Sequence, residues 1–288
     1  MGVVVNTNIS SITASRILAE NRADLEKAME RLASGKRINS AADDAAGMAV
    51  AAKMRADIRS LNQSVRNTND AISLVNTYDG AAEEIESILI RMRELAVQAK
   101  NGTYEQADRT NAAYEFTALQ SEITRIAGVS AFNRMTVGQG ATGVDGTTGS
   151  GNTTFNFYVG ADVAKSGNTI AFVAKGLDLN KTVSASTLYA IGDATAAGSA
   201  IASLDDALYK LAANRAEAGA LVNRLEHTVS NLLNVSQRLQ EAVSGIEDAD
   251  YASESANLAR GMVLAQAGTA MLAQANQAPQ YILSLLRG

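Results

Sequence analysis

Residues 54–92 read MRADIRSLNQSVRNTNDAISLVNTYDGAAEEIESILIRM, and this stretch decides the fold. Its apolar positions recur at alternating steps of four and three residues, with one irregular step after Val75. Such a repeat is typical of a helix that buries one stripe against neighbouring helices. The positions are Met54, Ile58, Leu61, Val65, Thr68, Ile72, Val75, Tyr78, Ala82, Ile85, Leu89 and Met92. The stretch therefore predicts a long helix with a coiled-coil seam.

Two further segments carry the same repeat. One is a shorter pattern after the Asn101-Gly102 break, at Ala112, Phe116, Leu119, Ile123 and Ile126. The other lies in the second half of the chain, at Leu204, Leu208, Leu211, Arg215, Ala218, Val222, Leu225, Val229, Leu232, Ser236, Leu239, Val243 and Ile246. On that last seam only Arg215 and Ser236 are clearly polar. Because three seams cannot each stay in water, they predict a mainly α fold, a long antiparallel helical bundle formed by both chain ends.

The middle of the chain has a different composition. Residues 138–151 carry six glycines among Thr and Ser, which no helix tolerates. Two β-prone runs follow, FNFYVG at 155–160 and TIAFVAKG at 169–176, separated by a polar turn at 165–168. The pattern predicts a small β-hairpin in a middle insertion.

Composition excludes several classes of function. The chain has no Cys and one His, His227, so disulfides, thiolate catalysis and Cys or His metal clusters are not expected, nor is a cofactor. The net charge is −5 and the Lys and Arg residues are interspersed with acids, which argues against a nucleic-acid partner. No window is apolar for long enough to span a bilayer, and Met1–Asn8 lacks a secretory signal pattern. We therefore expect no membrane insertion.

Residues 32–51, LASGKRINSAADDAAGMAVA, look at first like a phosphate or acid/base site. A P-loop needs an earlier Gly and a hydroxyl residue after its Lys, whereas Arg37 follows Lys36 here. A helix boundary explains the segment better. Gly35 fits the position that ends one helix, Ser40 and Asp43 form a capping box, and Asp44 adds favourable charge to the next helix start.

The other acidic pairs do not indicate catalysis. They are Glu83–Glu84, Asp205–Asp206 and Glu247–Asp248, and all lie on or beside expected helices. Neighbouring helical residues point apart, so solvated faces explain these pairs. His227 lies off the seam, and no G-x-S-x-G elbow is present. The sequence predicts that the protein is not an enzyme.

The two chain ends are rich in small apolar residues and carry an uncovered apolar surface. Such a surface, long and facing outward, is typical of an association site. We expect its side chains to be buried between copies of the chain. The residues assigned to this contact are Ile9, Ile12, Leu258, Met262, Leu272, Ile282, Leu285 and Leu286.

Over roughly residues 3–135 and 200–288 the chain resembles the bacterial flagellins. The resemblance rests on NTNISSITASR, LASGKRINSAADDAAGMAVA, RMRELAVQAKNGT, LQSEITRIAGVSAFN and the ending from DADYASESANLARG to YILSLLRG. It implies an inner tube of terminal helices at 1–40 plus 250–288, a helical rod at 41–137 plus 200–249, and a short variable insertion at 138–199. The joint between the two helical layers would contain Gly35, Arg37, Ser40, Asp43 and Asp44.

The resemblance also implies partners and a location. The chain would polymerise with copies of itself into an extracellular flagellar filament for swimming. It would be exported unfolded by the flagellar type III apparatus, with an export chaperone and a filament cap. In flagellins detected by the innate-immune Toll-like receptor, contact residues match Arg91, Leu95 and Glu122.

Three departures from the family pattern are present. Ile90 replaces a common Gln, Arg134 stands where Phe-Asn-Gly would place Gly, and residues 242–246 (AVSGI) lack two arginines. Three alternatives stay open at this point. They are a hook–filament junction protein of the same family, a secreted coiled-coil adhesin or translocator, and a nucleotide-dependent enzyme that uses Lys36 and Asp43.

Overall fold

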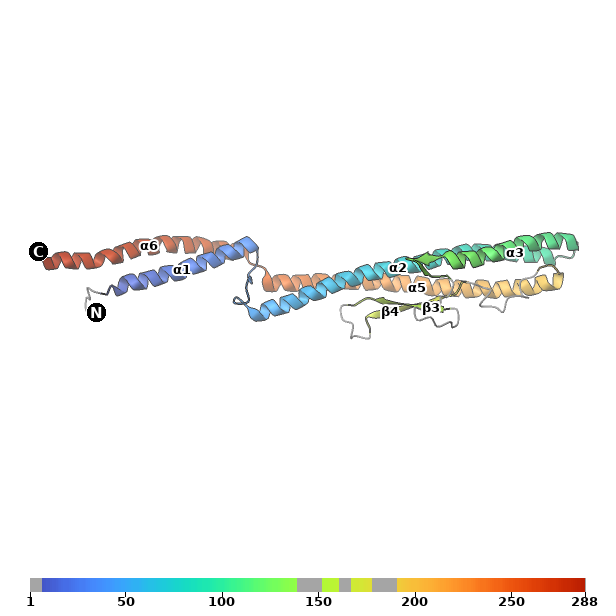
Figure 1. Cartoon of the computed structure of the whole chain (residues 1–288), viewed down its shortest axis with the longest axis horizontal. Coiled ribbons are helices and arrows are strands. Elements are labelled where there is room, and N and C mark those ends of the chain that lie inside the picture. The colour runs from blue at the N-terminus through green and yellow to red at the C-terminus, as the bar shows by residue number, and fades with distance from the viewer. Residues whose placement is uncertain (1–6, 139–151, 161–166, 178–190, 288) are drawn as a thin grey trace. The chain divides into compact units, whose positions relative to one another are not determined.

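The computed structural model describes residues 7–138, 152–160, 167–177 and 191–287, with side chains as far as residue 277 except that of Asn152. The elements, in chain order, are α1 (Ile9–Ser34), α2 (Ala45–Lys100), α3 (Gln106–Val129), β1 (Ala131–Phe132), β2 (Met135–Thr136), β3 (Asn152–Tyr158), β4 (Thr169–Lys175), α5 (Ala194–Glu247) and α6 (Tyr251–Arg287) (Figure 1). The mainly α fold with a small hairpin is confirmed.

The contacts divide the chain into two compact units. The first contains residues 1–58 and 237–288, and the second contains residues 59–236. Each unit draws on distant parts of the sequence, and α2 and α5 contribute residues to both. The finer division into 1–40 plus 250–288, 41–137 plus 200–249, and 138–199 stays a prediction.

In the second unit α2 and α5 pack as antiparallel helices with α3 beside them (Figure 1). Polar pairs establish the direction. Ser236 Oγ lies 3.2 Å from Asn62 Oδ1 and Arg93 Nε lies 2.6 Å from Asp205 Oδ1, so rising residue numbers on α2 face falling numbers on α5. Every seam position of this unit is buried or half-buried, which confirms the three predicted seams.

The predicted hairpin is confirmed as β3 paired antiparallel with β4, with Phe155 opposite Phe172. It packs on the bundle through Tyr78, whose ring meets the edge of Phe172 at 5.4 Å and whose hydroxyl donates to the Lys175 carbonyl at 3.0 Å. Burial, with the nearby Glu217 and Asp79 charges, raises the pKa of Tyr78, so the hydroxyl stays a neutral donor. Ser64 and Asn67 of α2 add hydrogen bonds to the carbonyls of Gly160 and Tyr158, so several side chains hold the hairpin on α2.

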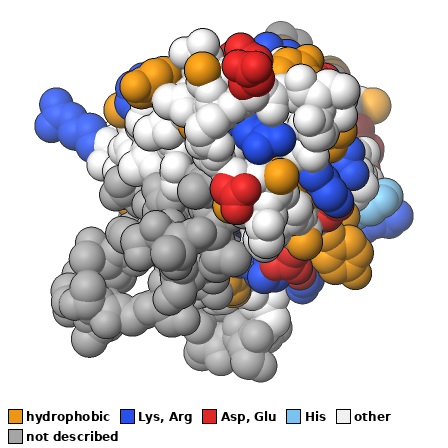
Figure 2. Space-filling view, turned by 90° about the vertical axis from the view of Figure 1, so that its right-hand side faces the viewer, with side chains coloured by type: hydrophobic (Ala, Val, Ile, Leu, Met, Phe, Trp, Pro, Cys, Tyr) orange, Lys and Arg blue, Asp and Glu red, His pale blue; other side chains and the backbone are white. Residues whose placement is uncertain are grey.

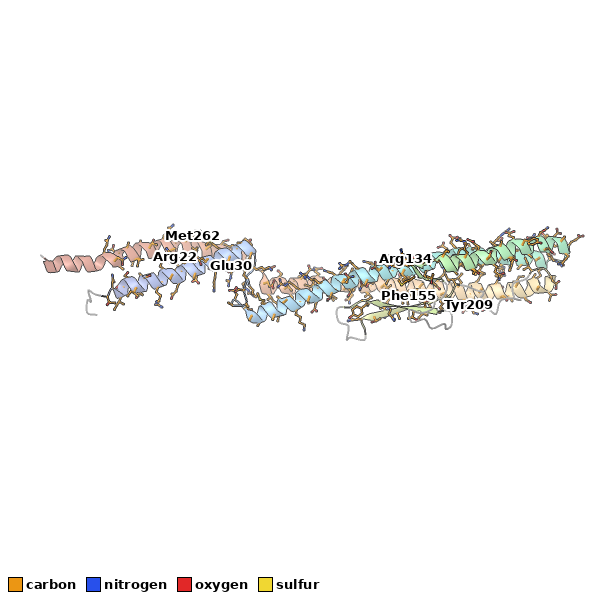
Figure 3. The ribbon with its side chains drawn as sticks, viewed as in Figure 1. Arg22, Glu30, Arg134, Phe155, Tyr209 and Met262 are labelled. Atoms are coloured by element: carbon orange, nitrogen blue, oxygen red, sulfur yellow. The ribbon has the colours of Figure 1, made fainter. Side chains whose placement is uncertain are left out.

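A two-residue turn joins β1 to β2. Asn133 has a φ of 48° and Arg134 a φ of 66°, the left-handed values at both central positions of a tight hairpin turn. Glycine would adopt the second position without steric cost, so Arg134 is the strained choice there (Figure 3). The departure noted in the sequence therefore has a local backbone cost.

The polar seam residue Arg215 reaches three carboxylates of α2. Its Nε lies 2.8 Å from Asp79 Oδ1, Nη1 lies 2.5 Å from Glu86 Oε2, and Nη2 lies 3.8 Å from Glu83 Oε2. The hydrogen bonds that Arg215 donates to Asp79 and Glu86 raise the pKa of Arg215. Asp79 and Glu86 are one heptad apart, so the guanidinium fixes which turn of α5 faces which turn of α2.

Replacing Arg215 with Gln leaves these carboxylates without a cation inside the bundle. We expect the free energy of unfolding to fall by about 1–3 kcal/mol, since the Arg215 side chain is 28% exposed and screening is partial. Chemical denaturation followed by circular dichroism measures it. Arg125→Gln is the matched control, because Arg125 pairs with Glu122 on an open helix face and its loss should change the stability much less. Equal losses in the two variants would contradict the special role of Arg215.

Candidate assembly surface and helix joint

Helices α1 and α6 of the first unit pair antiparallel along a heptad seam. Its buried or half-buried positions on α1 are Ser11, Ala14, Leu18, Asn21, Leu25, Ala28 and Leu32, and on α6 they are Glu254, Leu258, Gly261, Ala265, Gly268, Leu272 and Ala275. Both sets run at steps of three and four residues. Sequence reasoning missed this seam because Ala, Gly, Ser, Asn and Glu occupy most of it. The spacing of three and four residues was the signal in the sequence that could have revealed this seam.

Glycines on α6 accommodate leucines of α1. A Cβ built on Gly268 would lie 3.1 Å from Leu18 Cδ1, and one built on Gly261 would lie 3.3 Å from Leu25 Cδ1. Such distances are too short for an unshifted neighbour, so the missing side chains let the two helices approach closely.

Polar contacts close both ends of this helix pair. At one end Arg31 Nη1 lies 3.0 Å from Glu254 Oε1 and the Tyr251 hydroxyl donates to the Leu32 carbonyl at 2.8 Å. At the other end Asn8 Nδ2 donates to the Ala275 carbonyl at 2.7 Å. This carbonyl lacks its usual helical partner, because the residue four positions later is proline and has no N–H. Asn8 therefore satisfies the acceptor that the proline leaves open.

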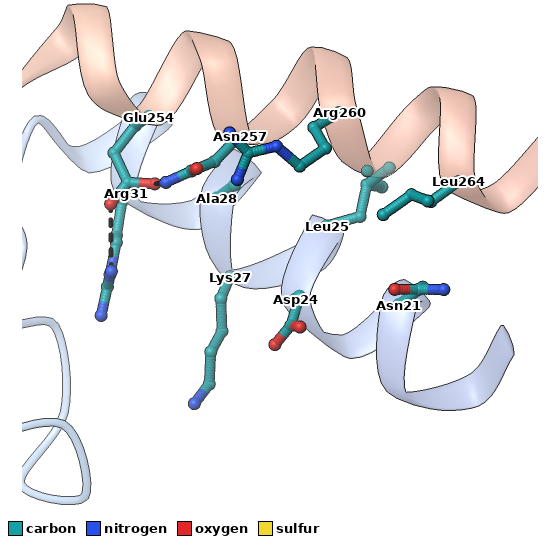
Figure 4. Close-up of a pocket in the computed structure, with 11 residues that line it drawn as sticks. Asn21, Asp24, Leu25, Lys27, Ala28, Arg31, Glu254, Asn257, Arg260 and Leu264 are labelled. Carbon is teal, nitrogen blue, oxygen red and sulfur yellow. Dashed lines mark hydrogen bonds and ion pairs between the residues drawn. The ribbon is translucent and has the colours of Figure 1, made fainter. Parts of the chain in front are cut away.

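A groove of about 300 Å³ runs between the two helices (Figure 4). Leu25 and Leu264 line its apolar end, and the ion pair of Arg31 with Glu254 borders the other. The groove carries both signs of charge, since Lys27 and Asp24 also line it. It is a shallow feature of the helix pair with no converging catalytic set.

The outer faces of α1 and α6 expose large apolar side chains. Ile9, Ile12 and Met262, three of the residues assigned to inter-subunit contact, are 65%, 60% and 49% exposed (Figure 3). Further members of this surface, which we call the outer apolar face, are Ile17, Val263, Leu264 and Met271. An uncovered surface of this kind on two paired helices is typical of an association site.

Two assigned contact residues have a different place. Leu258 and Leu272 are half-buried and occupy the α1–α6 seam, so their side chains are used within the chain. Their assignment to inter-subunit contact stays a prediction, since a half-buried side chain still has surface for a neighbouring copy. The side chains of Ile282, Leu285 and Leu286 lie outside the described residues, and their assignment stays a prediction.

The joint between α1 and α2 is a two-stranded ladder. Gly35 has a φ of 70° and its N–H donates to the Arg31 carbonyl, which ends α1 as predicted. The chain after it pairs with the chain after α5. Arg37 N–H donates to the Glu247 carbonyl at 2.6 Å, and Ala249 N–H donates to the Gly35 carbonyl at 3.0 Å. The two connections, one between α1 and α2 and the other between α5 and α6, are called the crossings below. These hydrogen bonds hold the two crossings together.

Glu247 is the charged centre of this joint. The residue is 4% exposed, its Oε1 lies 2.7 Å from Arg55 Nη2, and its Oε2 lies 3.9 Å from Lys36 Nζ. The expectation that Glu247 sits on a solvated face was wrong, because the paired crossings cover it. Arg37 adds a hydrogen bond from Nη2 to the Ile246 carbonyl at 2.6 Å. The cations of the segment thus bind their own chain.

The start of α2 differs in detail from the expected capping box. Ser40 N–H and its hydroxyl both donate to Asp43 Oδ2 at 3.0 Å, so the acid reaches back as predicted and its pKa is lowered by these bonds. The predicted bond from the serine oxygen to a helical N–H is wrong. Helix α2 begins at Ala45, and Asp44 caps it by accepting from Gly47 N–H at 2.8 Å.

The three residues assigned to receptor contact lie in the second unit. Arg91 is exposed and pairs with Glu115 at 2.9 Å and Glu94 at 3.0 Å, the former bond contributing most to its raised pKa. Glu122 faces Arg125 on α3, which lowers the pKa of Glu122. Leu95 is 3% exposed within the core, and its assignment as a contact stays a prediction. Arg91 and Glu122 remain available at the surface.

The described residues offer no alternative chemistry at these places. Lys36 faces Glu247, and Asp43 accepts main-chain N–H groups, so neither is arranged around a phosphate. Within the described ranges, no three His, Cys, Asp or Glu side chains converge as a metal site. Nor does any described helix combine the length and hydropathy needed to cross a bilayer.

These features define a class: a helical protein whose two chain ends pair as a coiled coil and leave an apolar outer face for association. Family models place it further. The bacterial flagellin N-terminal helical region matches residues 5–141 and the C-terminal helical region matches residues 201–286. The chain belongs to the bacterial flagellin family, a family of structural proteins.

Relatives align from end to end. Flagellin of Halalkalibacterium halodurans is 44% identical over 285 residues, covering 99% of this chain and 100% of the relative. The flagellar filament 33 kDa core protein of Treponema phagedenis is 39% identical over 99% of this chain and 100% of its own. A crystal structure of Bacillus cereus flagellin is 33% identical and superposes with a TM-score of 0.47, covering 58% of this chain and 88% of that one. The family assignment rests on the sequence matches.

Replacing Glu247 with Gln removes the charge that Arg55 and Lys36 face at the joint. We expect the first unit to lose about 2–3 kcal/mol of unfolding free energy, because both cations are left without an acid at a largely covered site. Hydrogen exchange at residues 35–37 and 247–249 measures the opening locally. Glu241→Gln, on an exposed turn of α5, is the control and should change little. Unchanged protection of the ladder in Glu247→Gln would contradict this account of the joint.

Proposed function

We propose that this chain is a structural subunit that polymerises with copies of itself into a flagellar filament outside the cell. The observation that carries the proposal is the outer apolar face of α1 and α6. Relatives that align with the whole chain bear the names flagellin and flagellar filament core protein, which supports the same conclusion. Catalysis forms no part of the proposal.

The free energy of burying these apolar side chains favours association through this face. Burying one fully exposed Ile, Val or Met side chain contributes about 1.5–3 kcal/mol, so covering the exposed parts of several such residues offsets much of the entropy cost of docking a subunit. The face lies on the outside of a helix pair, and we propose that it contacts a different surface of the neighbouring copy. Repeated heterologous contacts of this kind generate an open helical polymer instead of a closed dimer.

Ordering of the chain ends on assembly follows from the same composition. The α1–α6 seam buries mainly Ala, Gly and polar residues, so an isolated pair gains little hydrophobic free energy. Contacts between copies would supply the remainder, which is folding coupled to binding. We further propose export of the unfolded chain by the flagellar type III apparatus, with an export chaperone and a filament cap as partners and swimming as the outcome.

Replacing Ile12 with Asp tests the assembly surface. A carboxylate at this position would be buried without a partner between copies, so the critical concentration for polymerisation should rise at least about tenfold. The monomer should keep its helical content, since Ile12 is exposed. Light scattering and negative-stain microscopy of purified protein measure the outcome.

The matched control is Val173→Asp, an exposed apolar position on β4 of the hairpin. It should polymerise like the unaltered chain. Normal filaments from Ile12→Asp, or oligomers of one fixed size from the unaltered chain, would contradict the proposal. The second outcome would favour a coiled-coil adhesin. Failure of the unaltered chain to grow long filaments by itself would favour a hook–filament junction protein.

We also propose that the exposed α2–α3 surface around Arg91 and Glu122 binds the innate-immune Toll-like receptor for flagellin. Arg91→Ala should weaken receptor signalling by about tenfold, the scale of one lost interfacial Arg. Arg93→Ala is the control, because Arg93 is similarly exposed but pairs with Asp205 of α5. A cell reporter assay compares the two. Equal signalling from both variants would remove the receptor assignment while leaving assembly untouched.

A further inference from the structure

The turn between α2 and α3 contains Asn101-Gly102, the only Asn-Gly pair in the chain. Both residues are exposed, and a Cβ built on Gly102 would meet no atom within 4 Å. The Gly102 N–H donates no hydrogen bond to the described residues. This amide is therefore open to solvent and to the Asn101 side chain next to it in the sequence.

The carbonyl oxygen of Asn101 accepts two hydrogen bonds. Arg109 Nη2 donates to it at 3.3 Å and Tyr104 N–H donates at 3.4 Å. This oxygen belongs to the same peptide group as the Gly102 nitrogen. If that nitrogen loses its proton, the negative charge spreads onto this oxygen, where a cation and an N–H already point.

The guanidinium of Arg109 has few other partners among the described residues. Within the described residues it pairs with no acid, and its Nε is buried without a hydrogen-bond partner. The guanidinium of Arg109 thus directs its one described side-chain hydrogen bond at the turn. A buried donor without a partner is costly, so its position calls for an explanation.

We infer that Asn101-Gly102 is a self-modification site, at which Asn101 loses its amide to become aspartate or isoaspartate, and that Arg109 promotes the first step. The inference goes beyond the proposed assembly and does not depend on it. Among the described residues, the exposed Asn111 and Asn231 serve as comparisons. Both lie inside helices, and a residue with a side chain follows each.

The chemistry needs only water. Gly102 N–H gives its proton to solvent, and the nitrogen attacks Asn101 Cγ to form an N–C bond. The bond from Cγ to the side-chain nitrogen breaks, this nitrogen takes up a proton, and ammonia leaves, so that a five-membered imide ring remains. Water then adds to either ring carbonyl and opens the ring, which gives aspartate or isoaspartate. No group is oxidised or reduced.

The product changes the electrostatics of the turn. Each event adds one negative charge to a chain whose net charge is −5. The new carboxylate forms beside Arg109, the guanidinium that lacks an acidic partner. Figure 2 shows Lys and Arg side chains interspersed with Asp and Glu side chains on the end face of the molecule. Isoaspartate also lengthens the main chain by one atom.

Incubation of the full-length purified chain at mildly alkaline pH, followed by proteolysis and peptide mass spectrometry, tests the inference. Isoaspartate and aspartate should accumulate at Asn101 and not at Asn111 or Asn231. Gly102→Ala, which the open space permits, should lower the rate at least about threefold by restricting the backbone. Arg109→Gln should lower it at least about tenfold, because the variant removes one donor to the oxygen that takes up the negative charge.

Two further variants separate charge from packing. Arg109→Lys should restore part of the rate, because it keeps the cation. Arg125→Gln, on the exposed face of the same helix, should leave the rate unchanged. Circular dichroism checks that each variant folds. Equal accumulation at Asn111, or an unchanged rate in a folded Arg109→Gln variant, would overturn the inference.

Discussion

Pairing between the two ends of the chain is the constraint on which the rest of the structure depends. Helix α1 buries its seam against α6, and α2 buries its seam against α5 and α3. The heptad period sets which residues face each other, and Arg215 sets the turn at which they do so. Once the ends pair, large apolar side chains such as Ile9 and Val263 stay exposed on the described part of α1 and α6.

Specific contacts at the joint between the helices support this pairing. Two extended crossings, one after Gly35 and one after Glu247, hydrogen-bond to each other, and the covered Glu247 carboxylate holds Arg55 and Lys36. The charged side chains of the segment that resembles a phosphate site in sequence therefore make their contacts within the chain. A similar contact within the chain occurs at Ala275. The proline four residues later has no N–H to donate to the Ala275 carbonyl, and the Asn8 side chain donates to it instead.

Much of this fold could be predicted from sequence, because a period of seven in large apolar residues is a strong signal. The stripes on α2, α3 and α5 and the hairpin were predicted for that reason. The α1–α6 seam was missed because Gly and Ala carry it. Leu95 continues the α2 seam by a further step of three beyond Met92, and its burial fits that period. Glu247 was missed because its burial depends on a crossing two hundred residues away in sequence.

The central claim is that the outer apolar face of α1 and α6 becomes an interface between copies of the chain. A cryo-electron microscopy reconstruction of filaments grown from the purified chain tests it most directly. The account predicts that Ile9, Ile12, Met262 and Val263 are buried against neighbouring subunits, while the α1–α6 seam stays within one subunit. A filament in which these four side chains face solvent, with subunits held together elsewhere, would contradict it.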